Sequence, residues 1–131
     1  MKILFVCKHN RFRSKSAEAL FRKYNKNPRV TAESAGTLGS LNKTSDAVKK
    51  VLAERGAKVV SDTPRVVTAE LMSKFDKIIV VADNVSLEEF PLERTEVWKI
   101  SDCGEHVLED IRPVVDKIEE KVKDLVKELS E

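Results

Sequence analysis

The stretch FVCKHNRFRSKSAEALF, residues 5–21, joins an apolar run to a helical pattern and places a cysteine and an arginine near the junction. The full run, KILFVC (2–7), is typical of a buried strand, and the residues after Ser14 predict a helix over about 15–26. Cys7 therefore stands where a strand ends and close to where a helix begins. The unsatisfied N–H groups and the positive dipole end of that helix favour a bound anion and a thiolate over a thiol.

Arg13 follows Cys7 by six positions, where the loop returns to the helix. Its planar guanidinium can hold two oxygens of a phosphate-like anion that rests on the thiolate. In that arrangement the sulfur attacks phosphorus in line while Arg13 and the loop amides stabilise the transferred group, with no metal or cofactor. The predicted phosphate-binding loop consists of Lys8, His9, Asn10, Arg11, Phe12, Arg13 and Ser14. Taken separately, Cys7 and Arg13 also fit a buried apolar residue and an exposed helix residue.

The other common phosphate loops are missing from the sequence. Neither GxxxxGK[ST] nor GxGxxG occurs, and the four glycines are scattered. This argues against a nucleotide-binding enzyme.

A phosphate monoester also needs a proton donor for its leaving oxygen. Asp102 follows the run EVWKI (96–100) by two residues. Loops at the carboxyl ends of parallel strands gather over one crevice, so we expect Asp102 to approach the Cys7 loop as the catalytic acid. A helix cap or a plain loop aspartate is the alternative.

The remaining pattern predicts one α/β domain over residues 1–131. Apolar runs at 2–7 and 76–83 are expected as central strands, 29–34 as a further strand and 96–100 as an outer strand. Helical patterns cover 45–55 and 68–74, and Gly56 is expected just past a helix end. The predicted architecture is a three-layer, four-stranded parallel sheet with helices on both faces.

The clearest helical stripe lies near the carboxyl terminus. Its apolar members are Ile111, Val115, Ile118, Val122, Leu125 and Leu129. Their spacing predicts a helix that packs on the sheet, with a short coiled coil as the alternative. Pro113 is expected in the first turn, where its missing N–H costs nothing.

Composition narrows the functional classes. There are 24 Lys and Arg against 22 Asp and Glu, a net charge of +2, which does not favour nucleic acid or an anionic membrane as partner. The opening apolar run is too short for a signal peptide or a membrane span. The two cysteines, Cys7 and Cys103, form no CxxC pair, which fits a reducing, cytoplasmic compartment.

The segment CKHNRFRS (7–14) resembles the C-x5-R-S loop of the low-molecular-weight protein tyrosine phosphatases, whose fold family also contains thioredoxin-coupled arsenate reductases. SAGT (34–37), SDTPR (61–65), DKIIVVAD (76–83) and an aspartate before the last helix follow in the same order. The resemblance implies a flavodoxin-like fold, Cys7 as nucleophile, Arg13 as phosphate clamp and Asp102 as acid and then base. It also implies supporting roles for Asn10, Ser14 and Ser34, and a phosphorylated protein or small aryl phosphate as substrate.

Three positions depart from that family. Cys103 replaces the proline after the aspartate, Phe12 replaces a second loop cysteine, and the segment after SAGT offers Leu38 and Leu41 in place of an aromatic wall. Cys103 could capture an oxidised Cys7 as a disulfide, or it could be an idle, buried thiol.

Two other functions stay open. An arsenate reductase would use Cys7 and Cys103 together with an external thiol reductant, and His9 resembles that side of the family. A non-catalytic module would bind phosphate without turnover. Lys8, Arg11 and Lys15 are expected to ring the loop, where they attract an acidic substrate or are merely solvated.

Overall fold

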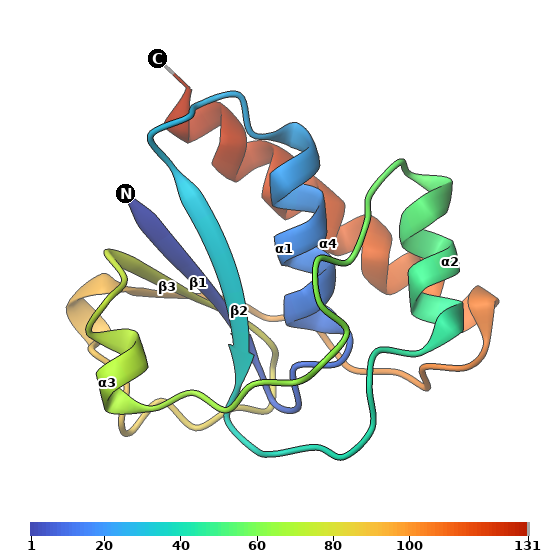
Figure 1. The fold of residues 1–131 in the computed structure, drawn as a ribbon, viewed down its shortest axis with the longest axis horizontal. Coiled ribbons are helices and arrows are strands. Elements are labelled where there is room, and N and C mark those ends of the chain that lie inside the picture. Colours follow the sequence, from blue (N-terminus) through green and yellow to red (C-terminus); the bar gives the residue numbers. More distant parts are fainter. Residues whose placement is uncertain (131) are drawn as a thin grey trace.

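The computed structural model describes residues 1–130, which form a four-stranded parallel sheet with helices on both faces (Figure 1). The strands are β1 (Lys2–Cys7), β2 (Thr31–Gly36), β3 (Lys77–Val81) and β4 (Thr95–Trp98). Their order in the sheet is β2-β1-β3-β4. The two most apolar runs therefore lie at the centre and β4 at an edge, as predicted, in the strand order of flavodoxin-like folds.

Helices α1 (Arg13–Tyr24), α2 (Asp46–Glu54) and α4 (Leu108–Leu129) gather on one side of the sheet, and α3 (Ala69–Met72) lies on the other (Figure 1). A 3-10 turn, η1 (Leu92–Arg94), precedes β4. Gly56 has a φ of +72° and follows Arg55, the residue that caps α2. The predicted helix stop at this glycine is confirmed.

Successive side chains of β1 point to opposite faces of the sheet, so they contribute to two separate apolar cores. Ile3 and Phe5 pack with α1, α2 and α4, and the Phe5 ring lies 5.8 Å from that of Trp98. Leu4 and Val6 point to the opposite face, toward α3 and the segment that follows β3. A strand covered on both faces needs apolar residues at every position, which explains the unbroken run at 2–7.

The stripe on α4 is buried, apart from the partly buried Leu129, in one core cluster with α1 and with residues of the sheet such as Phe5 and Ile79, so the predicted packing of this helix on the sheet is confirmed. The prediction for Pro113 is wrong. Helix α4 begins at Leu108, and Pro113 lies inside it at the sixth position. There the ring removes an N–H that would otherwise bond within the helix.

The limits of three strands differ from the predicted ones, and β3 is shorter than predicted, spanning Lys77–Val81 rather than 76–83. β2 spans Thr31–Gly36 rather than 29–34, because its pairing with β1 runs from Lys2 opposite Thr31 to Cys7 opposite Gly36. β4 ends at Trp98 rather than at 100, since the Ile100 N–H bonds back to the Trp98 carbonyl. Pairing partners and local hydrogen bonds decide these ends, and they are not visible in a single run of residues.

Gly36 allows the Cys7 loop to pack directly on β2. A Cβ at this position would lie 2.8 Å from the Asn10 nitrogen and 2.9 Å from the His9 carbonyl carbon. The loop and the ends of all four strands therefore meet at one edge of the sheet. Within residues 1–130, no helix combines the length and the apolar character required to cross a membrane.

Candidate active site

Cys7 ends β1 at the base of a loop that leads into α1, and its side chain is almost completely buried. α1 spans Arg13–Tyr24, two residues earlier at each end than the predicted 15–26. Among residues 1–130 no side chain caps its N-terminus, and its first turn contains no acidic residue. The first N–H groups of the helix thus remain available beside the loop, which is a suitable environment for an anion.

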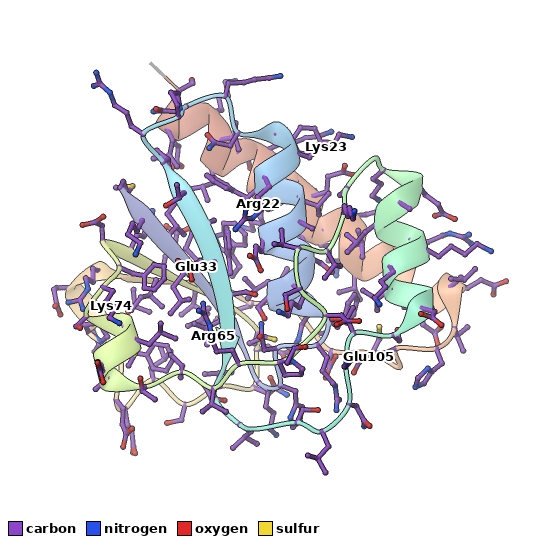
Figure 2. All side chains as sticks on the ribbon, in the orientation of Figure 1. Arg22, Lys23, Glu33, Arg65, Lys74 and Glu105 are labelled. Atoms are coloured by element: carbon purple, nitrogen blue, oxygen red, sulfur yellow. The ribbon has the colours of Figure 1, made fainter. Side chains whose placement is uncertain are left out.

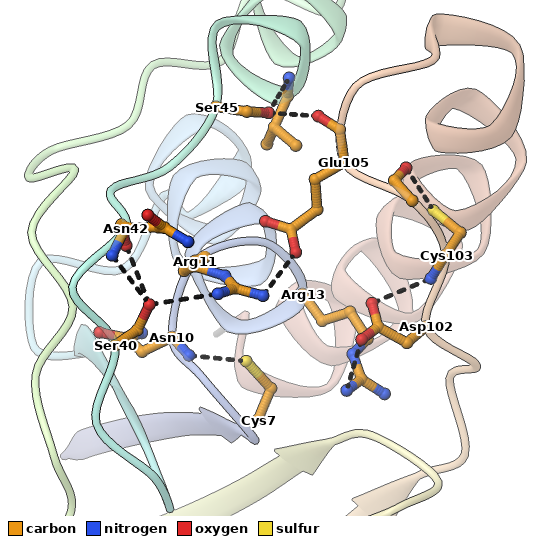
Figure 3. Close-up of polar contacts among 12 residues, drawn as sticks. Cys7, Asn10, Arg11, Arg13, Ser40, Asn42, Ser45, Asp102, Cys103 and Glu105 are labelled. Carbon is orange, nitrogen blue, oxygen red and sulfur yellow. Dashed lines mark hydrogen bonds and ion pairs between the residues drawn. The ribbon is translucent and has the colours of Figure 1, made fainter.

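Hydrogen bonds behind the loop determine which groups donate to Cys7. The Arg65 backbone N–H donates to Asn10 Oδ1 (2.9 Å), so Asn10 Nδ2 is the group that donates to Ser14 Oγ (2.8 Å) and Ser34 Oγ (3.0 Å). Ser14 Oγ lies 3.0 Å from Cys7 Sγ, and a Cys7 thiolate, which has no proton to donate, accepts this bond from the Ser14 hydroxyl. The Asn10 backbone N–H also points at the sulfur, at 3.3 Å (Figure 3). Both donors stabilise a thiolate.

The same network continues to a buried carboxylate. Ser34 Oγ donates to Glu18 Oε1 at 2.6 Å, and Glu18 also pairs with Arg22. Asn10 reaches its position with a φ of +56°, a left-handed conformation that asparagine tolerates better than most residues. Arg65 in turn pairs with Glu33 on the outer side of β2 (Figure 2). We name this group of residues, Asn10, Ser14, Glu18, Ser34 and Arg65, the rear network.

Arg13 is 2% exposed, and the loops after β3 and β4 hold its guanidinium. It donates to the Ile100 carbonyl (2.8 Å) and to Asn84 Oδ1 (3.0 Å). Carboxylate oxygens of Asp83 and Asp102 each lie 3.7 Å from it. These contacts fix the guanidinium at the carboxyl edge of the sheet, beside the helix terminus that faces Cys7.

Asp102 lies at the mouth of the site, as expected. Its side chain is 39% exposed, and one oxygen accepts from the Cys103 backbone N–H at 2.9 Å while the other faces Arg13 (Figure 3). The cavity above the sulfur is lined by Cys7, His9, Arg11, Phe12, Arg13, Asp102 and Glu105. The structure thus brings the predicted nucleophile, clamp and acid to one small cavity.

Two predicted loop residues have weaker connections to that cavity. Lys8 contributes its carbonyl, which accepts from the Leu38 N–H, and its side chain is not part of the lining. His9 does line the cavity, and its Nδ1 is buried without a hydrogen-bond partner among residues 1–130.

Lys15 does not ring the mouth, which corrects the expectation. It is 4% exposed and lies behind the loop, where Nζ donates to the Thr63 carbonyl at 3.1 Å. Burial lowers the pKa of this ammonium group. The first turn of α1 presents position 15 to the interior because α1 is covered almost all round, and the sequence alone did not show this.

Cys103 adjoins Asp102 in sequence but lies outside the lining of the cavity. Its Sγ is directed to the Gly104 carbonyl, away from Cys7 (Figure 3), and its side chain packs against the main core. Partial burial, followed by the charge of Asp102, raises the pKa of the thiol.

The sequence did not single out several residues of the site. Asp83 and Asn84 lie two and three residues after the end of the central strand β3, so the edge-of-sheet argument used for Asp102 would also have found them. Glu18 stands four residues after Ser14, on the same side of α1. Arg65 and Glu105 come from loops and carried no comparable signal.

Comparison with known proteins places the chain among phosphatases and their relatives. Residues 2–131 match the model of the family "Low molecular weight phosphotyrosine protein phosphatase". An arsenate reductase structure from Archaeoglobus fulgidus is 37% identical, with a TM-score of 0.77 over 95% of this chain and 98% of that one. The arginine phosphatase YwlE from Geobacillus stearothermophilus is 24% identical (TM-score 0.85, 98% and 92% covered). A low-molecular-weight protein tyrosine phosphatase from T. tengcongensis is 20% identical (TM-score 0.87, 98% and 99% covered).

Proposed function

Because the chain belongs to the low-molecular-weight phosphotyrosine protein phosphatase family, we propose that it hydrolyses phosphate monoesters through a cysteinyl-phosphate intermediate. One observation carries the proposal. Cys7 Sγ lies within hydrogen-bond distance of the Ser14 hydroxyl and of the Asn10 backbone N–H, beside the N-terminus of α1, whose first residue is Arg13. These groups together stabilise a nucleophilic thiolate and a bound phosphoryl group.

In the first step the Cys7 thiolate attacks phosphorus, so that the S–P bond forms and the P–O bond to the leaving group breaks. Asp102, in its protonated form, transfers its proton to the leaving oxygen. Arg13 and the loop N–H groups stabilise the charge on the remaining phosphoryl oxygens. Arg13 suits this role because its guanidinium is already held in place by Ile100 and Asn84.

In the second step water attacks the phosphorus of the intermediate, and the Asp102 carboxylate takes the proton from that water. The S–P bond breaks, phosphate leaves and the thiolate is restored. The Ser14 hydroxyl, 3.0 Å from Cys7 Sγ, supports the sulfur as a leaving group by donating to it.

We infer a phosphorylated protein or a small aryl phosphate as the substrate. Within residues 1–130, Phe12 is the only Phe, Tyr or Trp that lines the cavity, and it is itself buried, while polar and charged residues provide most of the remaining wall. Such a mouth provides little stacking surface for a tyrosine ring, so the proposed substrate class is not restricted to phosphotyrosine.

The test is the hydrolysis of para-nitrophenyl phosphate in EDTA with reductant, across pH, together with trapping of a ³²P-labelled protein by acid quench. Wild type is expected to turn over and to carry label on Cys7. Cys7→Ser should lower kcat by about 10⁴-fold or more, whereas Cys103→Ser, the matched control, should retain it. Turnover that survives in Cys7→Ser would refute the mechanism.

Arsenate reduction is the second candidate, since the relative from A. fulgidus bears that name and is 37% identical. Cys7 would form a thiol–arsenate ester, and Cys103 would then attack the Cys7 sulfur, releasing arsenite and leaving a disulfide for an external thiol to reduce. The orientation of Cys103 requires the 101–107 loop to rearrange before that bond can form. Arsenate-dependent thiol consumption that Cys103→Ala abolishes would favour this function.

A phosphate-binding module without turnover is the remaining alternative. Tight binding of inorganic phosphate that needs Arg13, combined with neither ester hydrolysis nor arsenate reduction by the wild type, would favour it.

A further inference from the structure

Three loops are tied together in front of Cys7 by Arg11 and Glu105. Arg11 NH2 pairs with Glu105 Oε2 at 3.0 Å, and its NH1 donates to Ser40 Oγ at 3.2 Å. The Glu105 carbonyl accepts from Ser45 Oγ at 2.5 Å, and Ser45 also caps α2 (Figure 3). The Cys7 loop, the 37–45 segment and the 101–107 loop thus meet at one ion pair.

This ion pair narrows the mouth of the cavity. Arg11 and Glu105 both line it, the free volume is about 10 Å³, which is room for about one water molecule, and Cys7 is only 3% exposed. A phosphoryl group with its leaving group is much larger. Something at the mouth must therefore move before a substrate can reach the sulfur.

The Arg11–Glu105 pair is less firmly held than Arg13, the other cation in the wall of the cavity. The two side chains are 23% and 14% exposed, whereas Arg13 is 2% exposed and bonds to a backbone carbonyl. Among residues 1–130, no atom lies within 4 Å of the place that a Cβ on Gly104, immediately before Glu105, would occupy. The backbone beside Glu105 is therefore open on that side, and it can swing outward once the Ser45 bond to the Glu105 carbonyl breaks.

We propose that the Arg11–Glu105 pair is a latch over Cys7, and that Arg11, once released, binds a second anionic group carried by the substrate. Its guanidinium then exchanges the Glu105 carboxylate for a carboxylate or phosphate of the leaving group, so that its charge stays paired. The favoured substrates are phosphate esters with an acidic group near the ester, such as a phosphorylated residue in an acidic peptide. The substrate part rests on the proposed function, but the latch does not.

Alkylation of Cys7 tests the latch without turnover. Two reagents of similar size are compared, neutral iodoacetamide and anionic iodoacetate. Peptide mass spectrometry distinguishes alkylation of Cys7 from alkylation of Cys103. Rates are taken at the plateau of each variant's pH profile, so that the thiolate fraction does not enter the comparison. The variants are Arg11→Gln, Glu105→Gln and the double variant, with exposed α4 residues as matched controls, Lys117→Gln and Glu120→Gln.

The latch predicts that both single variants react faster with iodoacetamide, by about fivefold, as expected for loss of one shielded ion pair. The double variant should gain no more than either single variant, since each change opens the same latch. The ratio of iodoacetate to iodoacetamide rates should rise in Glu105→Gln, which frees the Arg11 charge, and fall in Arg11→Gln. Iodoacetamide rates equal to those of wild type and controls would overturn the latch, and an unchanged reagent ratio in both variants would overturn anion recognition by Arg11.

Substrate choice is tested with para-carboxyphenyl phosphate and para-nitrophenyl phosphate. The ratio of their kcat/KM values should fall about fivefold in Arg11→Gln, and comparing ratios cancels the difference between the leaving groups. A ratio equal to that of wild type would overturn the substrate assignment. If neither ester is hydrolysed by wild type, the proposed function fails, while the alkylation rates still decide the latch.

Discussion

Behind Cys7, the buried side chains of Asn10, Ser14, Ser34 and Glu18 join the loop to β2 and α1, and Arg65 reaches them through its backbone N–H. In front of Cys7, more exposed charged side chains join the loop to its neighbours. Asn10, Ser14 and Ser34 are at most 4% exposed, while Asp102 is 39% exposed. Buried polar groups lose stability when one partner is removed, because the remaining group is left unsatisfied. Exposed ion pairs contribute little to stability and can change partners.

The comparison teaches that the site separates two tasks. The rear network holds the nucleophile in place with hydrogen bonds that are buried away from water. The mouth carries charged side chains that can accept or donate protons and can change their ion-pair partners. Substitutions behind Cys7 should therefore affect folding and turnover together, and those in front should affect turnover alone.

The largest expected effect is at the mouth. Asp102→Asn removes the proposed acid, so kcat should fall by about 10²- to 10⁴-fold, while the free energy of unfolding stays within about 0.5 kcal/mol of wild type. Para-nitrophenyl phosphate kinetics and urea unfolding measure the two quantities. Asp124→Asn, an exposed carboxylate on α4, is the control. A large loss of stability in Asp102→Asn would show that the mouth is structural after all.

The next effect is in the rear network. Asn10→Ala removes three side-chain hydrogen bonds and puts alanine at a φ of +56°, so the free energy of unfolding should fall by about 2–4 kcal/mol. Turnover by the remaining folded protein should also fall, because the Ser14 hydroxyl loses its orientation.

Asn25→Ala is the matched control for Asn10→Ala. The Asn25 amide also makes three hydrogen bonds, to Asn27 and Val30, at the end of α1 remote from Cys7. The Asn25→Ala variant should therefore have a lower free energy of unfolding than wild type but the same kcat. Equal kcat in both variants would contradict a specific role for the rear network.

Gly36→Ala tests how closely the loop packs on β2. The added Cβ would meet the backbone of Asn10 and His9 at 2.8 and 2.9 Å, so the loop must shift and the free energy of unfolding should fall by about 1–3 kcal/mol. Gly104→Ala, at the mouth, meets nothing within 4 Å and should change it by less than about 0.5 kcal/mol. Urea denaturation measures the free energy of unfolding of both variants. Similar losses of stability in Gly36→Ala and Gly104→Ala would contradict the contrast between the tightly packed loop and the open mouth.

The smallest effect is a pH dependence from Lys15. Burial lowers the pKa of its ammonium group in the folded protein, so in the range just below its ordinary value of 10.5 the unfolded chain binds more protons. Stability contributed by this group therefore rises with pH through that range. The unfolding free energy of wild type minus that of Lys15→Met should increase between pH 8 and about 10.5. A difference that is flat or falls would contradict the assignment.

Much of the fold and of the candidate site could be predicted from the pattern of neighbouring residues in the sequence. Unbroken apolar runs identified the central strands, and the positions of Cys7, Arg13 and Asp102 relative to strand ends predicted a shared cavity. The errors have two causes. The limits of β2 and the burial of Lys15 depend on partners that are remote in sequence, whereas the end of β4 and the start of α4 ahead of Pro113 depend on local backbone geometry that the residue types alone do not specify.

The sequence by itself determined the parallel α/β fold and the strand–loop–helix junction at Cys7, because apolar runs, helix spacing and residue types act over a few neighbouring positions. Only the tertiary structure decided which groups complete the junction. Arg65 orients the Asn10 amide across 55 residues, and Glu105 meets Arg11 across 94. Such contacts form when the ends of parallel strands converge, and the close approach at Gly36 then decides which side chains lie behind the sulfur and which lie in front of it.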